Sequence, residues 1–220
     1  MLGLILPCLV TLVALAGVAP AQADRERALI MAAGDGDIGS VRRLLQEGAS
    51  VHAADEHGVT ALIAAAYRNQ VEVARLLVGA GADVDRQDRT KQSAFLIATS
   101  DGYVDLLRLT LEAGADVHRT DSYNGTGLIR AADRGHVEVI RELLKTPIRL
   151  DHVNRLGWTA LLEAVILGDG GPRHTEVVRL LVEAGAGVNI ADSGGVTPLA
   201  HARTRGFTAI VKILEAKGAR

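Results

Sequence analysis

The chain has 220 residues and a formal net charge of −2, with 48% hydrophobic and 3% aromatic residues. Basic and acidic residues are interspersed along it, which disfavours nucleic acid as a partner, because a phosphate-binding surface normally carries an excess of Lys and Arg. Apart from its uncharged beginning, the composition is that of an ordinary soluble protein whose core is built from Leu, Val, Ile and Ala.

Residues 1–23 contain no charged side chain and end in the small-residue pattern Ala21-Gln22-Ala23. This pattern is typical of a secretory signal peptide that is cleaved after Ala23. Cleavage would remove Cys8, the only cysteine, which suits a protein of an oxidising compartment. The alternative is an uncleaved membrane anchor, since about 20 apolar residues span a bilayer. We expect a periplasmic or secreted protein, with membrane contact only if the N-terminus is uncleaved.

Apolar landmarks recur along the chain at a fixed period. Leu62, Phe95, Leu128 and Leu161 are separated by 33 residues each, and the equivalent Leu199 follows after 38. A period of this length predicts a repeat architecture in which each unit buries its apolar face against the next. The five extra residues (38 − 33) fall within residues 168–175, whose three glycines and proline predict a loop.

Within one period the sequence predicts a turn followed by two helices. In the unit 55–87, Asp55 and Gly58 are typical of the turn, and Thr60 is typical of a helix N-cap. Lys91 stands at the glycine's place in the next unit. That turn is therefore expected to be strained or to have a different shape.

The period, the helix-turn-helix content and several short motifs resemble the ankyrin repeat. The motifs are Thr60-Ala61-Leu62, Gly81-Ala82-Asp83-Val84 and Thr197-Pro198-Leu199. The resemblance covers almost everything after residue 24, and it implies an all-α ankyrin-repeat solenoid of about six helix-turn-helix units joined by short hairpin turns. After the signal peptide 1–23, the ankyrin repeat domain 24–220 is expected to contain the units 24–54 (N-terminal cap), 55–87, 88–120, 121–150, 151–191 (with the five-residue insertion) and 192–220 (C-terminal cap).

The sequence contains no motif of a catalytic, cofactor or metal site. The glycine-rich segment 168–171 is not followed by the Gly-Lys-Ser/Thr of a phosphate loop, and no His-Glu-x-x-His occurs. Neither a cysteine nor a Gly-x-Ser-x-Gly turn offers a nucleophile in the mature chain. We therefore expect a non-catalytic protein with no cofactor and no metal.

The resemblance implies that the protein binds another protein, because the hairpin tips and the exposed face of the first helices form a concave binding surface in ankyrin repeat proteins. Carried over unit by unit, the candidate residues are Tyr67, Arg68, Arg89, Tyr123, Arg134, Leu156, Trp158, Ile166 and Leu167. Large apolar residues at such positions predict a binding hot spot. The alternative is that Trp158 lies flat on the stack while Ile166 and Leu167 pack under the inserted loop.

The expected form is therefore a monomeric scaffold for a protein partner that the sequence does not identify. Two alternatives are a membrane-anchored structural or protective protein, and a stabiliser or regulator of one exported enzyme. Each would use the same solenoid in a different setting.

A polar column is also expected along the connections between units. Its members are His52, Asp85, His118, Asp151 and Asn189. One hypothesis is that histidine and aspartate titrate together near pH 6 and alter the stiffness of the stack. The alternative, which the resemblance favours, is that these residues bond the backbone of the turns.

Overall fold

The structure is a computed structural model that describes residues 18–220; residues 1–17, and with them most of the predicted signal peptide, lie outside the described residues. Twelve α-helices form the regular structure of the described part. The turns between them contain two isolated β-bridges, one of which joins Ala54 to Thr60 and the other Thr120 to Thr126. The expectation of an all-α chain is confirmed.

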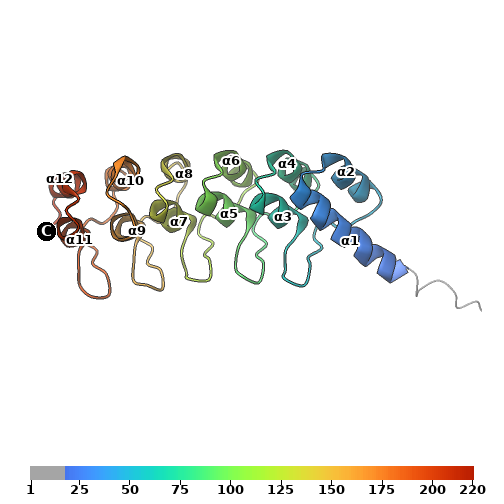
Figure 1. The fold of residues 1–220 in the computed structure, drawn as a ribbon, viewed down its shortest axis with the longest axis horizontal. Helices are drawn as coiled ribbons and strands as arrows, with labels where there is room; N and C mark the ends of the chain where they lie inside the picture. Colours follow the sequence, from blue (N-terminus) through green and yellow to red (C-terminus); the bar gives the residue numbers. More distant parts are fainter. Residues whose placement is uncertain (1–17) are drawn as a thin grey trace, which may run out of the picture.

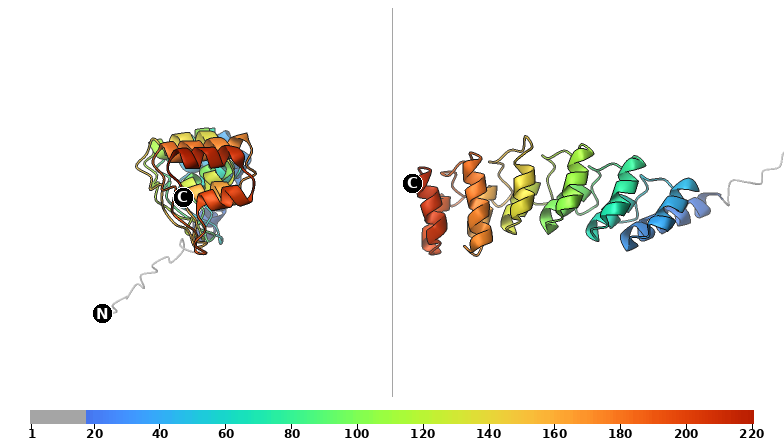
Figure 2. Two further views of the ribbon diagram at one scale, coloured as in Figure 1. Left: turned by 90° about the vertical axis from the view of Figure 1, so that its left-hand side faces the viewer. Right: turned by 90° about the horizontal axis from the view of Figure 1, so that it is seen from above.

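The helices form six pairs that are stacked side by side (Figure 1). The first helices of the pairs are α1 (Val18–Asp35), α3 (Ala61–Tyr67), α5 (Ala94–Asp101), α7 (Gly127–Asp133), α9 (Ala160–Ile166) and α11 (Pro198–Thr204). The second helices are α2 (Ile38–Gln46), α4 (Val71–Gly79), α6 (Val104–Glu112), α8 (Val137–Leu143), α10 (Pro172–Glu183) and α12 (Thr208–Ala216). Each set forms one layer, and the hairpins project beyond the layer of first helices (Figures 1 and 2).

Five of the first helices begin at a hydroxyl side chain. The side-chain oxygen accepts a hydrogen bond from the backbone N–H three residues on, at 3.3 to 3.4 Å. The capping residues are Thr60, Ser93, Thr126, Thr159 and Thr197. These bonds satisfy one of the backbone donors that a helix start leaves free, so the N-cap prediction for Thr60 is confirmed.

The core runs continuously between the two layers and from unit to unit. The periodic residues Leu62, Phe95, Leu128, Leu161 and Leu199 are all buried. Burying one such side chain typically contributes about 1.5–3 kcal/mol. Because most of each unit's apolar surface faces a neighbouring unit, the repeat pattern itself specifies the stack.

The hairpin turns share one backbone conformation despite their different sequences. Gly58, Lys91, Asn124 and Gly157 have φ values of 80°, 66°, 59° and 83°. A residue with a Cβ is strained in this left-handed region by about 1–2 kcal/mol, and asparagine tolerates it better than lysine. Of the two expectations for Lys91, the strained turn holds and the altered turn shape does not.

The first unit departs from the others because a helix replaces its hairpin. One period before the hairpin residues 55–60 lie residues 22–27, which belong to α1. The amide of Gln22 donates to Glu26 (2.8 Å) and to the carbonyl of Gly48 (3.2 Å). The predicted cleavage site after Ala23 therefore falls inside α1, and cleavage stays a prediction. Within residues 18–220, no helix is both long and apolar enough to cross a membrane.

The insertion in the fifth unit is shorter as a loop than the sequence suggested. Helix α10 begins at Pro172 and has 12 residues, so the loop expected over 168–175 ends at residue 171. Proline is well tolerated at the first position of a helix, where its missing N–H is not needed. His174 anchors the added turn, since its ring nitrogens lie 2.8 Å from the Asp169 carboxylate and 3.0 Å from the carbonyl oxygen of Asp133.

Candidate interaction surface

The same side-chain arrangement holds each of the five hairpins, which are numbered by their units from the second to the sixth. One side-chain oxygen accepts hydrogen bonds from the backbone N–H groups two and four residues on, at 2.8 to 3.0 Å. The residues that supply this oxygen are Asp55, Asp88, Asp121, Asn154 and Asp192. Asp and Asn favour such turns because their short side chains reach their own backbone. The tips are therefore ordered before any partner arrives.

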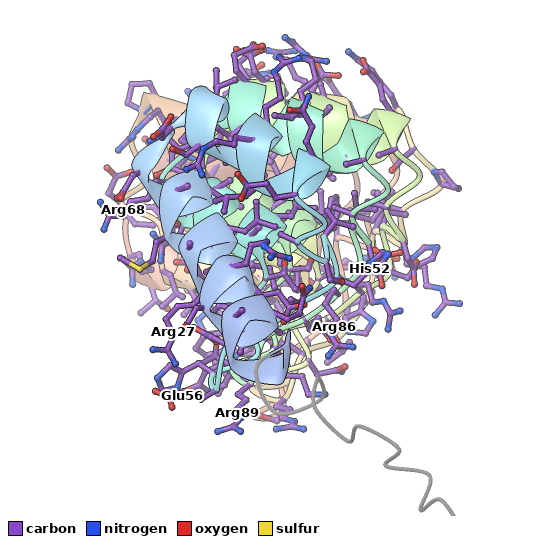
Figure 3. All side chains as sticks on the ribbon, turned by 90° about the vertical axis from the view of Figure 1, so that its right-hand side faces the viewer. Arg27, His52, Glu56, Arg68, Arg86 and Arg89 are labelled. Atoms are coloured by element: carbon purple, nitrogen blue, oxygen red, sulfur yellow. The ribbon has the colours of Figure 1, made fainter. Side chains whose placement is uncertain are left out.

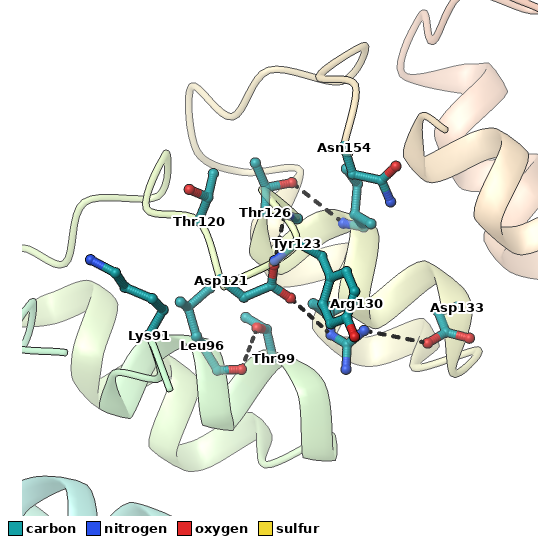
Figure 4. A network of polar contacts seen from close by, with 12 residues as sticks. Lys91, Leu96, Thr99, Thr120, Asp121, Tyr123, Thr126, Arg130, Asp133 and Asn154 are labelled. Atoms are coloured by element: carbon teal, nitrogen blue, oxygen red, sulfur yellow. Dashed lines mark hydrogen bonds and ion pairs between the residues drawn. The ribbon is translucent and has the colours of Figure 1, made fainter. Parts of the chain in front are cut away.

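In four of the five hairpins, the second polar atom of this side chain contacts a residue of a first helix. The carboxylate of Asp121 lies 3.5 Å from Arg130 Nε, and Arg130 in turn lies 3.9 Å from Asp133 (Figure 4). Asp192 lies 2.8 Å from the ring of His201. Asp88 accepts from the hydroxyl of Tyr67 at 2.7 Å. These contacts fix the hairpins against the first helices.

Tyr67 is thus held at the surface by its polar end. Its side chain is exposed, but its hydroxyl is bound to Asp88. Partial burial of the phenol, followed by the bond to Asp88, raises the pKa of Tyr67 to about 12. The hydroxyl therefore stays a donor throughout the neutral range, and Tyr67 offers a partner mainly its ring.

Neighbouring hairpin tips are bonded to one another. The backbone N–H of Arg89 donates to the carbonyl of His57, and that of Arg155 donates to the carbonyl of Tyr123, both at 2.9 Å. The guanidinium of Arg155 also donates to the carbonyl of Ser122 at 2.7 Å. The fourth and fifth tips consequently form one connected surface.

The structure exposes seven of the nine candidate residues and partly buries two. Tyr123 is 60% exposed and Leu156 is 47% exposed on adjacent tips. Trp158 and Ile166 are partly buried. The other exposed candidates are Tyr67, Arg68, Arg89, Arg134 and Leu167. Of the three arginines, Arg134 pairs with Asp101 at 3.7 Å. A role for these residues in binding stays a prediction.

Sequence reasoning missed two features of this surface. Val153, next to the tip of the fifth hairpin, is an exposed large apolar residue and extends the patch of Tyr123 and Leu156. Glu163, on α9, is only 5% exposed and accepts from the amide of Asn154 at 2.6 Å. Glu163 occupies the same repeat position as Arg130, one 33-residue period earlier. The sequence therefore shows a charged residue at this position but does not predict that it is buried.

Burial of Glu163 changes its acidity. Desolvation, helped by the nearby charge of Asp133, raises the pKa of the Glu163 carboxyl to about 7. The other hairpins have aspartate at the position of Asn154. Here an aspartate would place a second carboxylate next to Glu163, whereas the asparagine donates a hydrogen bond to it. The fifth unit therefore carries a buried group that titrates near neutral pH.

Three of the five members of the polar column, Asp85, Asp151 and Asn189, bond the backbone of the turns as the ankyrin resemblance implies. Asp85 accepts from the N–H of Asp116 at 3.0 Å, and Asp151 accepts from the N–H of Gly187 at 2.8 Å. Asn189 accepts from the N–H of the final residue in the same way. His118 differs, because its buried Nδ1 has no hydrogen-bond partner among the residues described. The pH hypothesis for the column stays a prediction.

The structure contains no candidate metal centre within residues 18–220. Three or more His, Cys, Asp or Glu side chains do not converge there in a way that could hold a metal. The features that do stand out are ordered tips and exposed apolar side chains. These are suited to recognition.

A stack of helix pairs with projecting hairpins defines a helical repeat protein of the solenoid class. A family model described as ankyrin repeats in three copies matches residues 5–88 and 95–192. The chain therefore belongs to the ankyrin repeat family, as the sequence motifs indicated. Ankyrin repeat domains generally mediate protein–protein interactions and are typically non-catalytic.

The chain is similar to several other ankyrin repeat proteins. It is 47% identical over 74 residues to the ankyrin repeat protein YahD of Escherichia coli K12, a match that spans 34% of this chain and 37% of YahD. The crystal structure of an ankyrin repeat domain from Acinetobacter baumannii AYE is 47% identical, with a TM-score of 0.85 over 87% of this chain and 98% of that one. The ankyrin repeat protein EF0377 is 34% identical, with a TM-score of 0.83 over 89% and 98%.

Proposed function

We propose that the protein is a non-catalytic scaffold that binds a protein partner outside the cytoplasm, through the face formed by its hairpin tips and first helices. The observation that carries this proposal is the pair Tyr123 and Leu156, two exposed large side chains on tips that are bonded to each other. An exposed apolar patch on an otherwise polar surface generally has a binding role. Export rests on the predicted signal peptide.

The mechanism follows from the order of the tips. Their backbone N–H groups are already bonded to Asp and Asn side chains, so little conformational entropy is lost when a partner docks. A stack of six units at about 10 Å per helix pair offers enough length for the roughly 800 Å² per partner that a stable complex uses. Function would then depend on surface side chains and not on movement of the fold.

Affinity capture from the exported fraction tests this proposal. We expect the wild-type chain to retain a partner. The Tyr123→Ser/Leu156→Ser variant should bind this partner at least about tenfold more weakly, equivalent to 1.4 kcal/mol of binding free energy. The matched control is Ile38→Ser, which removes an exposed apolar side chain from α2, in the layer of second helices outside the proposed face. Equal capture by all three proteins would contradict the proposed site. Separately, if the protein from the exported fraction has an N-terminus before Asp24, cleavage after Ala23 is wrong.

A further inference from the structure

The third hairpin carries a local positive charge that the balanced composition conceals. Arg89 and Lys91 are exposed on its tip, and neither forms an ion pair within residues 18–220. In Figure 3, which looks at the α1 end of the stack, Arg89 lies at the level of the hairpin tips, while Arg86 and Arg68 lie on opposite sides of the molecule. We call Arg89 and Lys91 the cationic tip.

The acidic residue of the same hairpin is unavailable to these cations. Asp88 is buried, and its carboxylate accepts from the N–H and hydroxyl of Thr90, the N–H of Gln92 and the hydroxyl of Tyr67, at 2.7 to 3.0 Å. Its oxygens are thus used inside the fold. The two cations next to it are left with water as their partner, which is the state in which an external carboxylate can bind them.

The cationic tip and the apolar tips form a row. Gln87 links the third and fourth hairpins, because its amide donates to the carbonyls of Lys91 (2.7 Å) and Thr120 (2.9 Å). Backbone bonds link the fourth and fifth tips, where Tyr123 and Leu156 lie. In Figure 4 the Lys91 side chain extends away from the Asp121 and Arg130 network, so it is not neutralised there. The third tip therefore carries two cations without a protein partner among the residues described, whereas the fourth and fifth tips expose Tyr123 and Leu156, and their one cation, Arg155, is bonded to the carbonyl of Ser122.

We propose that these three tips bind one extended protein segment that is acidic at one end and apolar at the other. Its acidic residues contact the cationic tip, and its apolar residues contact Tyr123 and Leu156. The inference rests on the proposed binding function and specifies the chemistry of the partner. Adjacent units are about 10 Å apart and an extended chain advances about 3.3 Å per residue, so successive contacts are about three residues apart in the partner.

An acidic protein segment fits this surface better than nucleic acid. A long polyanion gains affinity from many phosphate contacts along a basic stripe. Here the second tip, next to the cationic one, carries Asp55 and Glu56, and the whole chain has a net charge of −2. A polyanion that continued beyond the cationic tip would therefore be repelled.

The test uses a fluorescent peptide with two glutamates followed by phenylalanine and leucine at intervals of about three residues, together with the peptide in reverse order. Binding is measured by anisotropy and by the emission of Trp158, the single tryptophan of the chain. We expect one of the two orders to bind, and the affinity to fall as salt rises from about 50 to 200 mM. A peptide with glutamine in place of glutamate should bind at least about tenfold more weakly.

The decisive variant is Arg89→Ser/Lys91→Asn, which installs the residues that Ser122 and Asn124 supply in the fourth tip. Asparagine keeps the left-handed turn, so the fold should be retained, as circular dichroism would verify. We expect about tenfold weaker binding of the glutamate peptide and no change for the glutamine peptide. The matched control is Arg42→Gln/Arg75→Gln, which removes the same charge from exposed residues of α2 and α4 and should bind like wild type.

Several outcomes would overturn the inference. These are no binding of either glutamate peptide at low salt, equal losses in the two charge variants, or tighter binding of single-stranded DNA or anionic lipid vesicles than of the peptide. If a captured partner is lost from Tyr123→Ser/Leu156→Ser but kept by Arg89→Ser/Lys91→Asn, the acidic contact is wrong while the binding function stands. If neither variant loses it, both are wrong.

Discussion

The two faces of the solenoid use their charged residues in different ways. On the face of the second helices, charges bridge neighbouring units, as Arg108 does to Glu142 (2.7 Å) and Arg141 to Glu176 (2.6 Å). On the hairpin face, the acidic side chains bond the backbone of their own turns, and several cationic and apolar side chains stay free. On the face of the second helices the charges are therefore paired with one another, whereas the hairpin face keeps cationic and apolar side chains available for a partner.

The largest expected effect is the difference in stability between truncating a core leucine and truncating a hairpin leucine. Leu143 on α8 is fully buried, so Leu143→Ala is expected to lower the free energy of unfolding by about 2–5 kcal/mol through loss of burial and a residual cavity. Leu156→Ala, at an exposed tip, should change it by no more than about 0.5 kcal/mol. Urea denaturation of both variants measures the difference, and similar losses would mean that the tip is part of the core.

The next effect concerns the buried carboxyl on the first-helix side. The folded pKa of Glu163 is about 7 against a reference of 4.5, so the native state holds this proton more tightly than the unfolded chain does. Protonation of Glu163 therefore adds to the free energy of unfolding. This contribution is fully present below pH 4.5 and is lost as pH rises through 7, and at 1.36 kcal/mol per pKa unit it amounts to up to about 3 kcal/mol.

The measurement for Glu163 is urea denaturation from pH 5 to pH 8. We expect the stability difference between Glu163→Gln and wild type to increase in favour of the variant over this range, because glutamine does not ionise. The charged groups that face Glu163 are Asp133, Arg130 and Asp121, with Asn154 as its hydrogen-bond donor. On α11, the ring of His201 lies 2.8 Å from the carboxylate of Asp192. A pH-independent difference would show that Glu163 titrates normally.

A smaller gain in stability is expected at the strained turn. Lys91→Gly should raise the free energy of unfolding by roughly 1 kcal/mol, because glycine adopts the left-handed conformation without a Cβ clash. Gly58→Ala, at the equivalent place in the second unit, should lower it by a comparable amount. Thermal denaturation compares the two, and a loss of stability in Lys91→Gly would mean that the lysine side chain makes a favourable contact.

The smallest effect should come from the bridges between second helices. Arg141 and Glu176 are both partly exposed, so their coupling is expected to be about 0.2–1 kcal/mol and to decrease with salt. A double-mutant cycle with Arg141→Ala and Glu176→Ala measures it. A coupling well above this range would indicate that the face of the second helices contributes more to stacking than exposed ion pairs normally do.

The sequence by itself determined the repeat. A 33-residue period of apolar landmarks, hydroxyl residues before the first helices and Asp or Asn at the hairpins are local patterns, and local patterns predict helices, caps and turns. For this reason the stack, the Thr60 cap and the ankyrin family could be inferred before any coordinates. The start of α10 at Pro172 was missed, because glycines and a proline are common to loops and helix starts alike.

Only the tertiary structure decided which side chains are free. Trp158 and Ile166 are partly buried at positions where the family resemblance predicted a binding surface, and Glu163 is buried although it is a charged residue type. Likewise, Asp88 and Lys91 look like neighbouring opposite charges in the sequence, but the hairpin turns one inward and leaves the other outside. Burial and hydrogen bonding depend on contacts between units, which a single unit's sequence does not contain.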